Sequence, residues 1–111
     1  MQLTMQLRWA LMSKRTKALG ISAKVRKEVY ERDQYCVLCG NPRSLQCAHF
    51  ISRGSGGLGI PQNLVMLCIN CHYKYDQTSA RDEIREQIRN YLSRYYKINE
   101  KELKYASKRN R

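Results

Sequence analysis

Helical periodicity of the hydrophobic positions predicts helices on both sides of the centre of the chain. The first runs from residue 23 to about residue 32, and Ser22 is placed to cap it. Its apolar side carries Val25 and Val29. The longest helix is expected over residues 80–96. Its apolar positions at helical spacing are Ile84, Ile88, Leu92 and Tyr95.

Between these helices, two short hydrophobic runs have the length and composition of β-strands. They cover residues 45–50 and 64–68, and the Gly-, Ser- and Pro-rich stretch 51–62 separates them as a loop. We expect the two strands to pair as an antiparallel hairpin with a long, ordered loop. A short helix is expected to follow, over residues 70–77. The pattern therefore predicts a small α+β fold.

These elements divide the chain into a central domain and two basic flanks. We expect a basic N-terminal arm over residues 1–21, the central domain over 22–79, and an amphipathic basic helix with a tail over 80–111. The tail from Ser107 is expected to be disordered. In the arm, four alternating hydrophobic residues are compatible with a strand but too few to establish one: Met1, Leu3, Met5 and Leu7.

The charge of the chain favours a polyanionic partner. Its 111 residues include 21 Lys and Arg against 9 Asp and Glu, a formal net charge of +12. Most of this charge lies toward the two ends of the chain, with +5 over residues 1–35 and +5 over 80–111. No apolar run approaches the roughly 20 residues of a membrane span, and the N-terminus lacks the pattern of a signal peptide. We therefore expect a cytoplasmic protein with reduced cysteines and no membrane partner.

Four of the five cysteines form two matched Cys-x-x-Cys pairs, and these are Cys36, Cys39, Cys68 and Cys71. Each pair presents two thiolates on a tight turn, and two such turns complete the tetrahedral shell of a structural zinc ion. Zinc binding would also add folding free energy to a domain with a thin core. The alternative is four buried free cysteines. The fifth, Cys47, is expected to act as a small buried hydrophobic residue.

Both histidines of the chain bracket the predicted hairpin. His49 closes the first strand, His72 directly follows the last paired cysteine, and Asn63 opens the second strand. The relevant segments are Cys36-x-x-Cys39, Ala48-His49, Gly56-Gly57, Gln62-Asn63-Leu64 and Leu67-Cys68-x-x-Cys71-His72. Together they resemble the HNH family of nucleases, whose shared element is the ββα-metal, or His-Me finger, fold. The resemblance covers roughly residues 22–78.

The resemblance implies a role in phosphodiester hydrolysis for each polar residue of the motif. It implies that His49 is the general base, which suits a side chain that titrates near neutral pH. It implies that Asn63 holds the base and the loop in position. It also implies that His72 is a ligand of a catalytic divalent cation, Mg²⁺ or Mn²⁺. Colicin-like members add a ligand one helical turn later, where this chain has Asp76; the alternative there is a solvated helix aspartate.

One position departs from the family pattern. Members of the family usually carry Asp or His directly before the base, as another metal ligand, but this chain has Ala48. Three interpretations follow. The cation is held by His72 and Asp76 with water in its remaining positions, or it binds weakly and activity is low, or the site is inactive and the domain only binds nucleic acid. We favour the first, because Asp76 is the only acidic residue between 34 and 81.

Four arginines are candidates for contacts with a phosphate backbone. Arg53 lies on the hairpin loop, whereas the other three recur at helical spacing in the C-terminal helix as Arg81, Arg85 and Arg89. The alternative is that these three form a solvated charged face.

The leading functional hypothesis is a metal-dependent DNA endonuclease that leaves 3′-hydroxyl and 5′-phosphate ends. One such centre cuts one strand, so double-strand cleavage requires a homodimer or two successive nicks. The resemblance extends to small stand-alone HNH proteins of phages and mobile elements, which implies DNA processing or packaging, with packaging proteins as further partners. The alternatives are a catalytically weak or inactive zinc module that binds DNA or RNA, and a zinc module that binds proteins.

Overall fold

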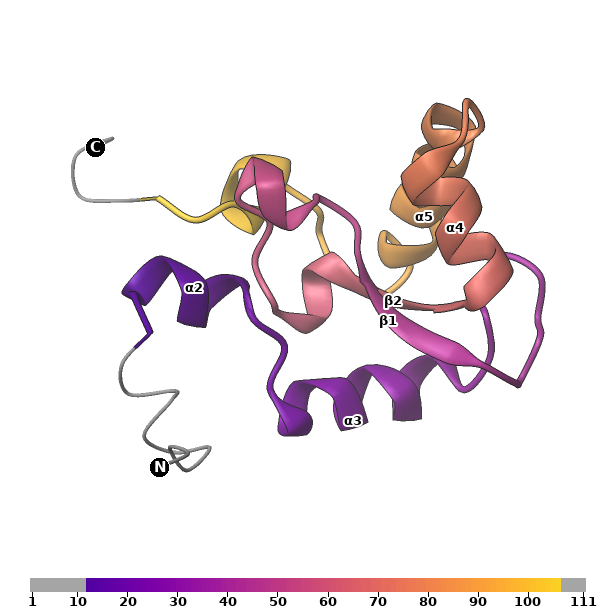
Figure 1. Ribbon diagram of the computed structural model, residues 1–111, viewed down its shortest axis with the longest axis horizontal. Helices are drawn as coiled ribbons and strands as arrows, with labels where there is room; N and C mark the ends of the chain where they lie inside the picture. Colours follow the sequence, from indigo (N-terminus) through magenta and orange to yellow (C-terminus); the bar gives the residue numbers. More distant parts are fainter. Residues whose placement is uncertain (1–11, 107–111) are drawn as a thin grey trace, which may run out of the picture.

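A computed structural model describes residues 12–106 and confirms a small α+β architecture around one two-stranded sheet (Figure 1). The alternating stretch from Met1 to Leu7 and the tail from Ser107 lie outside the described residues. The helices are α2 (Lys14–Leu19), α3 (Ala23–Asp33), α4 (Ile69–Gln77) and α5 (Arg81–Leu92). The strands are β1 (Leu45–His49) and β2 (Leu64–Cys68), and 3₁₀ turns lie at η1 (Arg53–Ser55), η2 (Pro61–Asn63) and η3 (Glu100–Leu103). Within the described part, no helix has the length and apolarity needed to cross a membrane.

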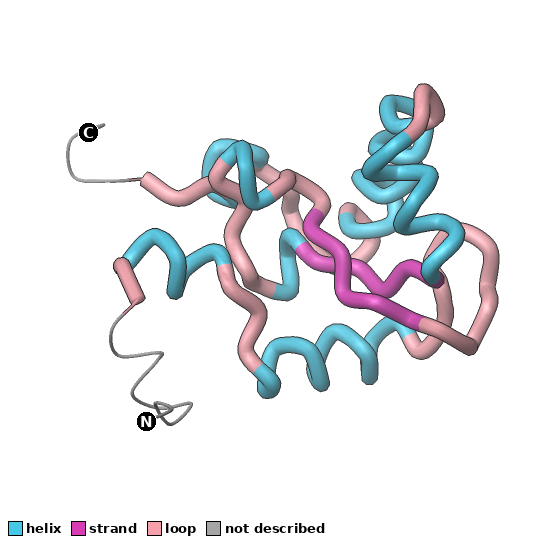
Figure 2. The backbone as a smooth tube through the Cα atoms, in the orientation of Figure 1, coloured by secondary structure: helices cyan, strands magenta, loops and turns pink. Residues whose placement is uncertain are grey.

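Helix α3 covers one face of the sheet. It begins where the sequence predicts, because the Ser22 hydroxyl accepts a hydrogen bond from the backbone N–H of Val25. The fully buried Val29 then packs against Leu64 and Met66 of β2. Figure 2 shows the helix running alongside the hairpin, on the side away from α4 and α5.

The hairpin is antiparallel, as predicted, with a register that runs from Leu45 opposite Cys68 to His49 opposite Leu64. Every residue of β2 is buried. Alternate residues of β2 face α3, whereas Val65 and Leu67 belong to the cluster on the other face. Because both faces are covered by helices, β2 has a continuous apolar run and not an alternating one.

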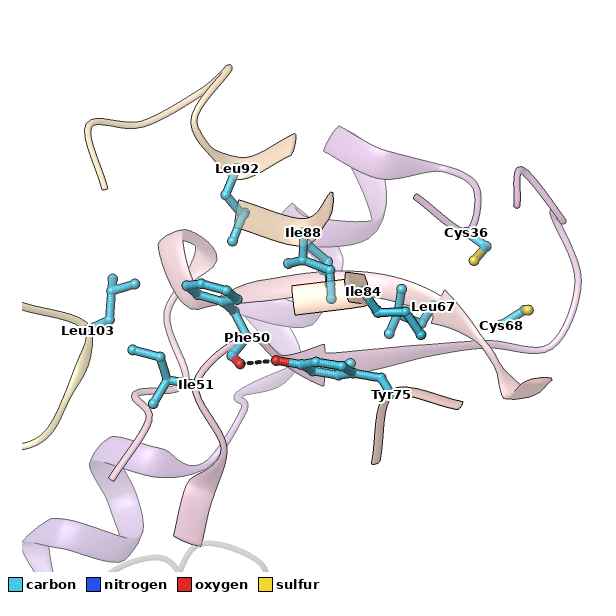
Figure 3. Close-up of a cluster of buried hydrophobic side chains, with 12 residues drawn as sticks. Cys36, Phe50, Ile51, Leu67, Cys68, Tyr75, Ile84, Ile88, Leu92 and Leu103 are labelled. Carbon is cyan, nitrogen blue, oxygen red and sulfur yellow. Dashed lines mark hydrogen bonds between the residues drawn. The ribbon is translucent and has the colours of Figure 1, made fainter. Parts of the chain in front are cut away.

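The larger hydrophobic cluster lies between the sheet and helices α4 and α5 (Figure 3). Ile84, Ile88 and Leu92 supply the buried face of α5, as the helical spacing predicts. The buried Tyr75 of α4 donates a hydrogen bond from its hydroxyl to the Phe50 carbonyl at 2.5 Å. This bond ties α4 to the residue that directly follows His49 and so fixes the end of β1.

The C-terminal helix is shorter than the sequence predicts. Its expected range of residues 80–96 is wrong at the C-terminal end, because α5 stops at Leu92 and the chain then turns tightly. The backbone N–H groups of Tyr95 and Tyr96 both point to the Leu92 carbonyl at 3.0 Å. Tyr95 is consequently half exposed, at 51%, and its ring lies 5.6 Å from the Arg32 guanidinium carbon. The prediction that Tyr95 belongs to the apolar face of this helix is therefore wrong.

A buried carboxylate joins three parts of the fold. The Asp33 side chain is inaccessible to solvent and receives hydrogen bonds from the Arg32 guanidinium at 2.6 and 3.0 Å. It also accepts bonds from the backbone N–H of Met66 at 2.8 Å and the Tyr91 hydroxyl at 2.5 Å. Arg32 in turn donates to the Leu64 carbonyl at 2.6 Å. Helix α3, strand β2 and helix α5 are thereby connected through one ion pair.

Tyr91→Phe is expected to lower the free energy of unfolding by about 1.5 kcal/mol, because it removes a hydrogen bond to a buried charge. Urea titration of the zinc-loaded protein measures this. Tyr73→Phe is the matched control, since Tyr73 is 62% exposed and its hydroxyl bonds to no described residue. Equal stabilities for the two variants would show that the Tyr91–Asp33 bond contributes little.

Candidate active site and metal centre

The four paired cysteines meet at one end of the sheet. Cys36 and Cys39 lie in the turn after α3, Cys68 ends β2, and Cys71 lies in the first turn of α4. Their sulfur atoms all lie within 4.8 Å of one another, and those of Cys39 and Cys68 are 3.6 Å apart. A tetrahedral zinc site with Zn–S bonds of about 2.3 Å has sulfur–sulfur edges of about 3.8 Å. The four thiols are therefore placed to bind a metal such as zinc.

The backbone around these cysteines forms two tight turns. Gly40 has a φ of 79°, a left-handed conformation, and its N–H donates to the Cys36 carbonyl at 2.8 Å. Burial raises the pKa of the Cys36 thiol, but backbone hydrogen bonds outweigh it and lower the pKa to about 7. At Cys71, burial and the neighbouring cysteines raise the pKa. The Cys71 thiol therefore keeps its proton at neutral pH unless a cation lies among the four sulfurs.

His49 lies at the end of β1, where its imidazole is half buried. Its Nε2–H donates to the carbonyl of Leu19 at 2.8 Å, so the neutral ring carries its lone pair on Nδ1. Burial lowers the pKa of His49, and the charges of Arg53 and His72 lower it further, while the Leu19 carbonyl opposes them. The ring is therefore neutral, and able to accept a proton, at and somewhat below pH 6.5.

The acceptor for His49 comes from α2, which lies inside the predicted N-terminal arm. The Gly59 N–H donates to the Ala18 carbonyl at 2.9 Å and holds the end of this helix against the hairpin loop. A Cβ at Gly59 would lie 2.0 Å from the Gly20 carbonyl oxygen and 3.0 Å from that of Leu19. Glycine at this position is required for the approach that places the Leu19 carbonyl beside His49.

Asn63 is fully buried and holds the loop together. Its side-chain oxygen accepts from the Ile51 N–H at 2.8 Å, and its side-chain amide donates to the carbonyls of Ile51 and Leu58 at 3.1 and 2.9 Å. Its backbone carbonyl also accepts from the Phe50 N–H at 2.7 Å. A Cβ at Gly57 would collide with the Ile51 carbonyl at 1.7 Å. These contacts fix the two residues that follow His49.

His72 lies in α4 between two polar partners. Its Nδ1–H donates to the Gln46 side-chain oxygen at 2.7 Å, which in the neutral ring puts the lone pair on Nε2, where it faces a carboxylate and needs a proton or a cation between them. Nε2 lies 3.1 Å from Oδ2 of Asp76, one helical turn later. One nitrogen and one carboxylate oxygen are therefore adjacent, and both are suitable ligands for a divalent cation.

A single cleft of about 370 Å³ brings these side chains together. It is lined by both histidines and Asp76, with Arg53, Arg81, Ser52, Ala48, Cys47 and Ile21 completing its walls. Ala48 lies at the cleft and offers no ligand atom.

Among residues 12–106, the paired cysteines are the one group of three or more His, Cys, Asp or Glu side chains close enough to share a metal. A cation at His72 and Asp76 would need water or substrate oxygen atoms as further ligands.

The four predicted phosphate-binding arginines lie in different surroundings. Arg53 and Arg81 line the cleft, and Arg81 donates to the Tyr75 carbonyl at 3.1 Å. Arg85 and Arg89 both pair with Glu100, at 2.5 and 3.2 Å, and Arg89 also pairs with Glu86. Arg89 lines a separate hollow with Glu100 and Glu102. The regular spacing in the sequence therefore does not form one row of free cations.

Two contacts of the site were missed by sequence reasoning. Nothing in the sequence indicates the role of the Leu19 carbonyl, because any residue supplies a backbone carbonyl and α2 has only six residues. For Gln46 the sequence gives only a weak indication, since this residue lies three residues before His49 on the predicted strand.

Cys47 also lines the cleft, and burial raises its pKa to about 11, so the thiol is neutral at physiological pH.

Comparisons with known proteins give a family match for the central part of the chain and a similar fold. The family model described as HNH endonuclease matches residues 36–78. Among solved structures, the type IV phosphorothioation-dependent restriction endonuclease ScoMcrA is similar in fold, with a TM-score of 0.61 and 22% sequence identity. That alignment covers 79% of this chain but only 20% of ScoMcrA. No curated protein sequence matches the chain.

Proposed function

Because residues 36–78 match the family model described as HNH endonuclease, we propose that this protein is a metal-dependent DNA endonuclease that nicks one strand by hydrolysing a phosphodiester. The observation that carries the proposal is the shared cleft, in which His49 lies near the His72–Asp76 pair. The products would be 3′-hydroxyl and 5′-phosphate ends. A net charge of +12 favours a nucleic acid as the partner.

His49 is proposed as the general base. With Nε2–H donated to the Leu19 carbonyl, Nδ1 accepts the proton of a water molecule as that water attacks phosphorus. The bond from phosphorus to the 3′ oxygen breaks, and the leaving oxygen takes a proton from solvent. Asn63 keeps the segment after the base rigid, and Arg53 and Arg81 attract the phosphate into the cleft.

Two metals complete the proposal. Zinc at the four cysteines would be structural, because a shell of four sulfurs leaves no open position for water. His72 and Asp76 would hold Mg²⁺ or Mn²⁺, which supplies charge for the scissile phosphate and the leaving oxygen. Ala48 does not prevent this, because Mg²⁺ is commonly bound by one or two protein ligands with water and phosphate oxygens.

The second candidate is a zinc module that binds DNA or RNA with weak or no catalysis. The specific observation in its favour is Ala48, which supplies no ligand where the family usually has one. It predicts salt-sensitive binding without metal-stimulated cleavage.

A nicking assay on supercoiled plasmid separates the two candidates. With Mg²⁺ or Mn²⁺ we expect the open-circular form to accumulate, chelation of the divalent ion to stop the reaction, and DNA ligase to reseal the nicks. Resealing requires the predicted 3′-hydroxyl and 5′-phosphate ends. Salt-sensitive binding of the plasmid without metal-dependent nicking would contradict the nuclease and support the second candidate.

The biological setting is part of the same proposal. The resemblance to HNH proteins of phages and mobile elements suggests DNA processing or packaging within a host cytoplasm, with packaging proteins as partners. Cutting of both strands would then require a homodimer or two successive nicks.

Gln46→Leu is expected to weaken Mn²⁺ binding by about tenfold, within the range known for residues that orient a metal ligand. Without the acceptor at 2.7 Å, the His72 ring loses the bond that keeps Nε2 free for the metal. Electron paramagnetic resonance of bound Mn²⁺ measures the affinity directly. Gln46→Glu retains an acceptor oxygen and should bind Mn²⁺ at least as well as the wild type. Unchanged binding by the leucine variant would refute this role.

A further inference from the structure

A second, smaller hollow adjoins the cleft that holds the two histidines. It has a volume of about 210 Å³ and shares Ser52 and Arg81 with the cleft. Its remaining polar lining consists of Ser55, Asp82, Arg85 and Lys104. An anion bound in the cleft and one bound in this hollow would therefore lie on either side of the Arg81 side chain.

The two guanidinium groups at this hollow are held in place before any ligand arrives. Arg81 donates to the Tyr75 carbonyl at 3.1 Å, and its guanidinium carbon lies 4.6 Å from the centre of the Tyr75 ring. Arg85 lies 5.4 Å from the centre of the Phe50 ring and pairs with Glu100. Groups fixed in this way lose little conformational freedom when they bind a phosphate.

Lys104 reaches the hollow because the C-terminal segment is bonded to the glycine-rich loop. Gly57 and Lys104 form an antiparallel bridge, and the Tyr105 N–H donates to the Gly56 carbonyl at 2.8 Å. Figure 1 shows the C-terminal 3₁₀ turn η3 beside the loop that carries η1. Lys104 forms no ion pair with any residue between 12 and 106. Its ammonium group is therefore available to a ligand.

The charges at this hollow suit a phosphodiester. Three cations and one carboxylate, that of Asp82, line it, and Arg85 also pairs with Glu100 outside the lining, so the remaining positive charge comes mainly from Arg81 and Lys104. The Ser52 and Ser55 hydroxyls, 3.2 Å apart, add hydrogen-bonding groups. A third hollow, which shares Cys47 and His72 with the cleft, is different, because Arg26 is its one Arg or Lys and the rest of its lining is Leu45, Gln46 and Met66. Of these two hollows beside the cleft, both formed by described residues, the one with Arg81, Arg85 and Lys104 therefore carries more positive side chains.

We propose that this hollow binds the phosphodiester next to the scissile one, so that the cleaved strand passes from the histidines over Arg81 to Arg85 and Lys104. This inference rests on the proposed nuclease function and adds the path of the strand. In this proposal Arg81 and Arg85 contact the cleaved strand, whereas Arg89 does not, because it lies at another hollow with two glutamates. Contacts of this kind position the DNA and do not read its sequence.

Phosphate interference tests the path. The substrates are end-labelled duplexes in which one phosphate on either side of a mapped nick is replaced by an uncharged methylphosphonate. Wild-type protein is expected to lose cleavage several-fold when the substitution lies on one side, and to tolerate it on the other. Lys104→Ala should cut the unmodified duplex more slowly and respond less to the substitution on the sensitive side.

The matched control is Lys101→Ala, which removes a lysine of the 3₁₀ turn η3 directly before Lys104; Lys101 lines neither the cleft nor this hollow. It should respond to the methylphosphonates as the wild type does. Binding measured at several salt concentrations should show a slope that is smaller by about 0.9 for Lys104→Ala, as expected for one lost phosphate contact. An unchanged slope and an equal response to both substitutions in all three proteins would overturn the proposed path and leave the nuclease intact. A wild-type protein that cuts no duplex would overturn both.

Discussion

Replacing His49 by alanine is expected to lower the single-turnover rate of DNA nicking by about 10²–10⁴-fold, the usual contribution of a general base. The reason is that His49 and His72 are the two imidazoles among the described residues that line the cleft, and we propose His72 as the ligand of the cation. Zinc content and the free energy of unfolding should change little, because the ring is only half buried. Quenched-flow nicking in saturating Mn²⁺ measures the rate.

The control for His49→Ala is Cys47→Ala, a substitution on the same face of β1 and in the same cleft. This variant should retain nearly full activity, since the Cys47 thiol is neutral and has no assigned role. Equal rates for wild type and the His49 variant would remove His49 from the mechanism. Loss of activity in both variants would indicate that the cleft is sensitive to any change of packing.

The pH dependence of the wild-type reaction follows from the lowered pKa of His49. A base must be unprotonated to act, and burial shifts its protonation below the ordinary value of 6.5. The rate of the wild type should therefore be constant through neutral pH and fall only below about pH 6.5. A fall that begins above pH 7 would contradict this assignment.

Removal of the metal at the four cysteines is expected to unfold the domain. Structural zinc contributes about 10–16 kcal/mol of apparent binding free energy in small domains, comparable to or larger than the total stability of a typical domain. Cys36 and Cys68 are also buried members of the hydrophobic cluster, so four uncompensated thiols would lie at the edge of the core. A strong chelator should abolish the near-ultraviolet circular dichroism and release one zinc ion per chain.

Single cysteine variants test the same point without a chelator. Cys71→Ser should lose zinc and unfold, whereas Cys47→Ala should bind one zinc ion like the wild type, because Cys47 lies outside the cluster. A Cys71→Ser protein that is folded and free of zinc would show that packing alone maintains the fold.

Much of the central domain was predictable because its signals are local. The Ser22 cap, the two apolar runs and the two Cys-x-x-Cys pairs act within a few residues, and each forms the expected structure. The sequence also predicts that His49 and His72 serve one site, and both line one cleft, because α4 packs back along β1 and places His72 against Gln46. The residues of the candidate site could therefore be named from the sequence before their geometry was known.

Long-range polar contacts were not predictable. Arg32 and Asp33 are adjacent charges, which in a sequence look like an exposed pair, yet Asp33 is buried because Tyr91 and Met66 arrive from distant segments. The same holds for Glu100, which neutralises two arginines of α5. Helical spacing shows which residues share a face, but not which distant groups lie against it.

The central claim is that the cleft between His49 and His72 holds a divalent cation beside a base. Anomalous diffraction from a crystal of the zinc-loaded protein soaked in Mn²⁺ tests it most directly. The account predicts a manganese peak about 2.1 Å from His72 Nε2 and an Asp76 oxygen, and zinc at the four sulfurs. Zinc in place at the cysteines with no manganese bound to His72 would contradict it.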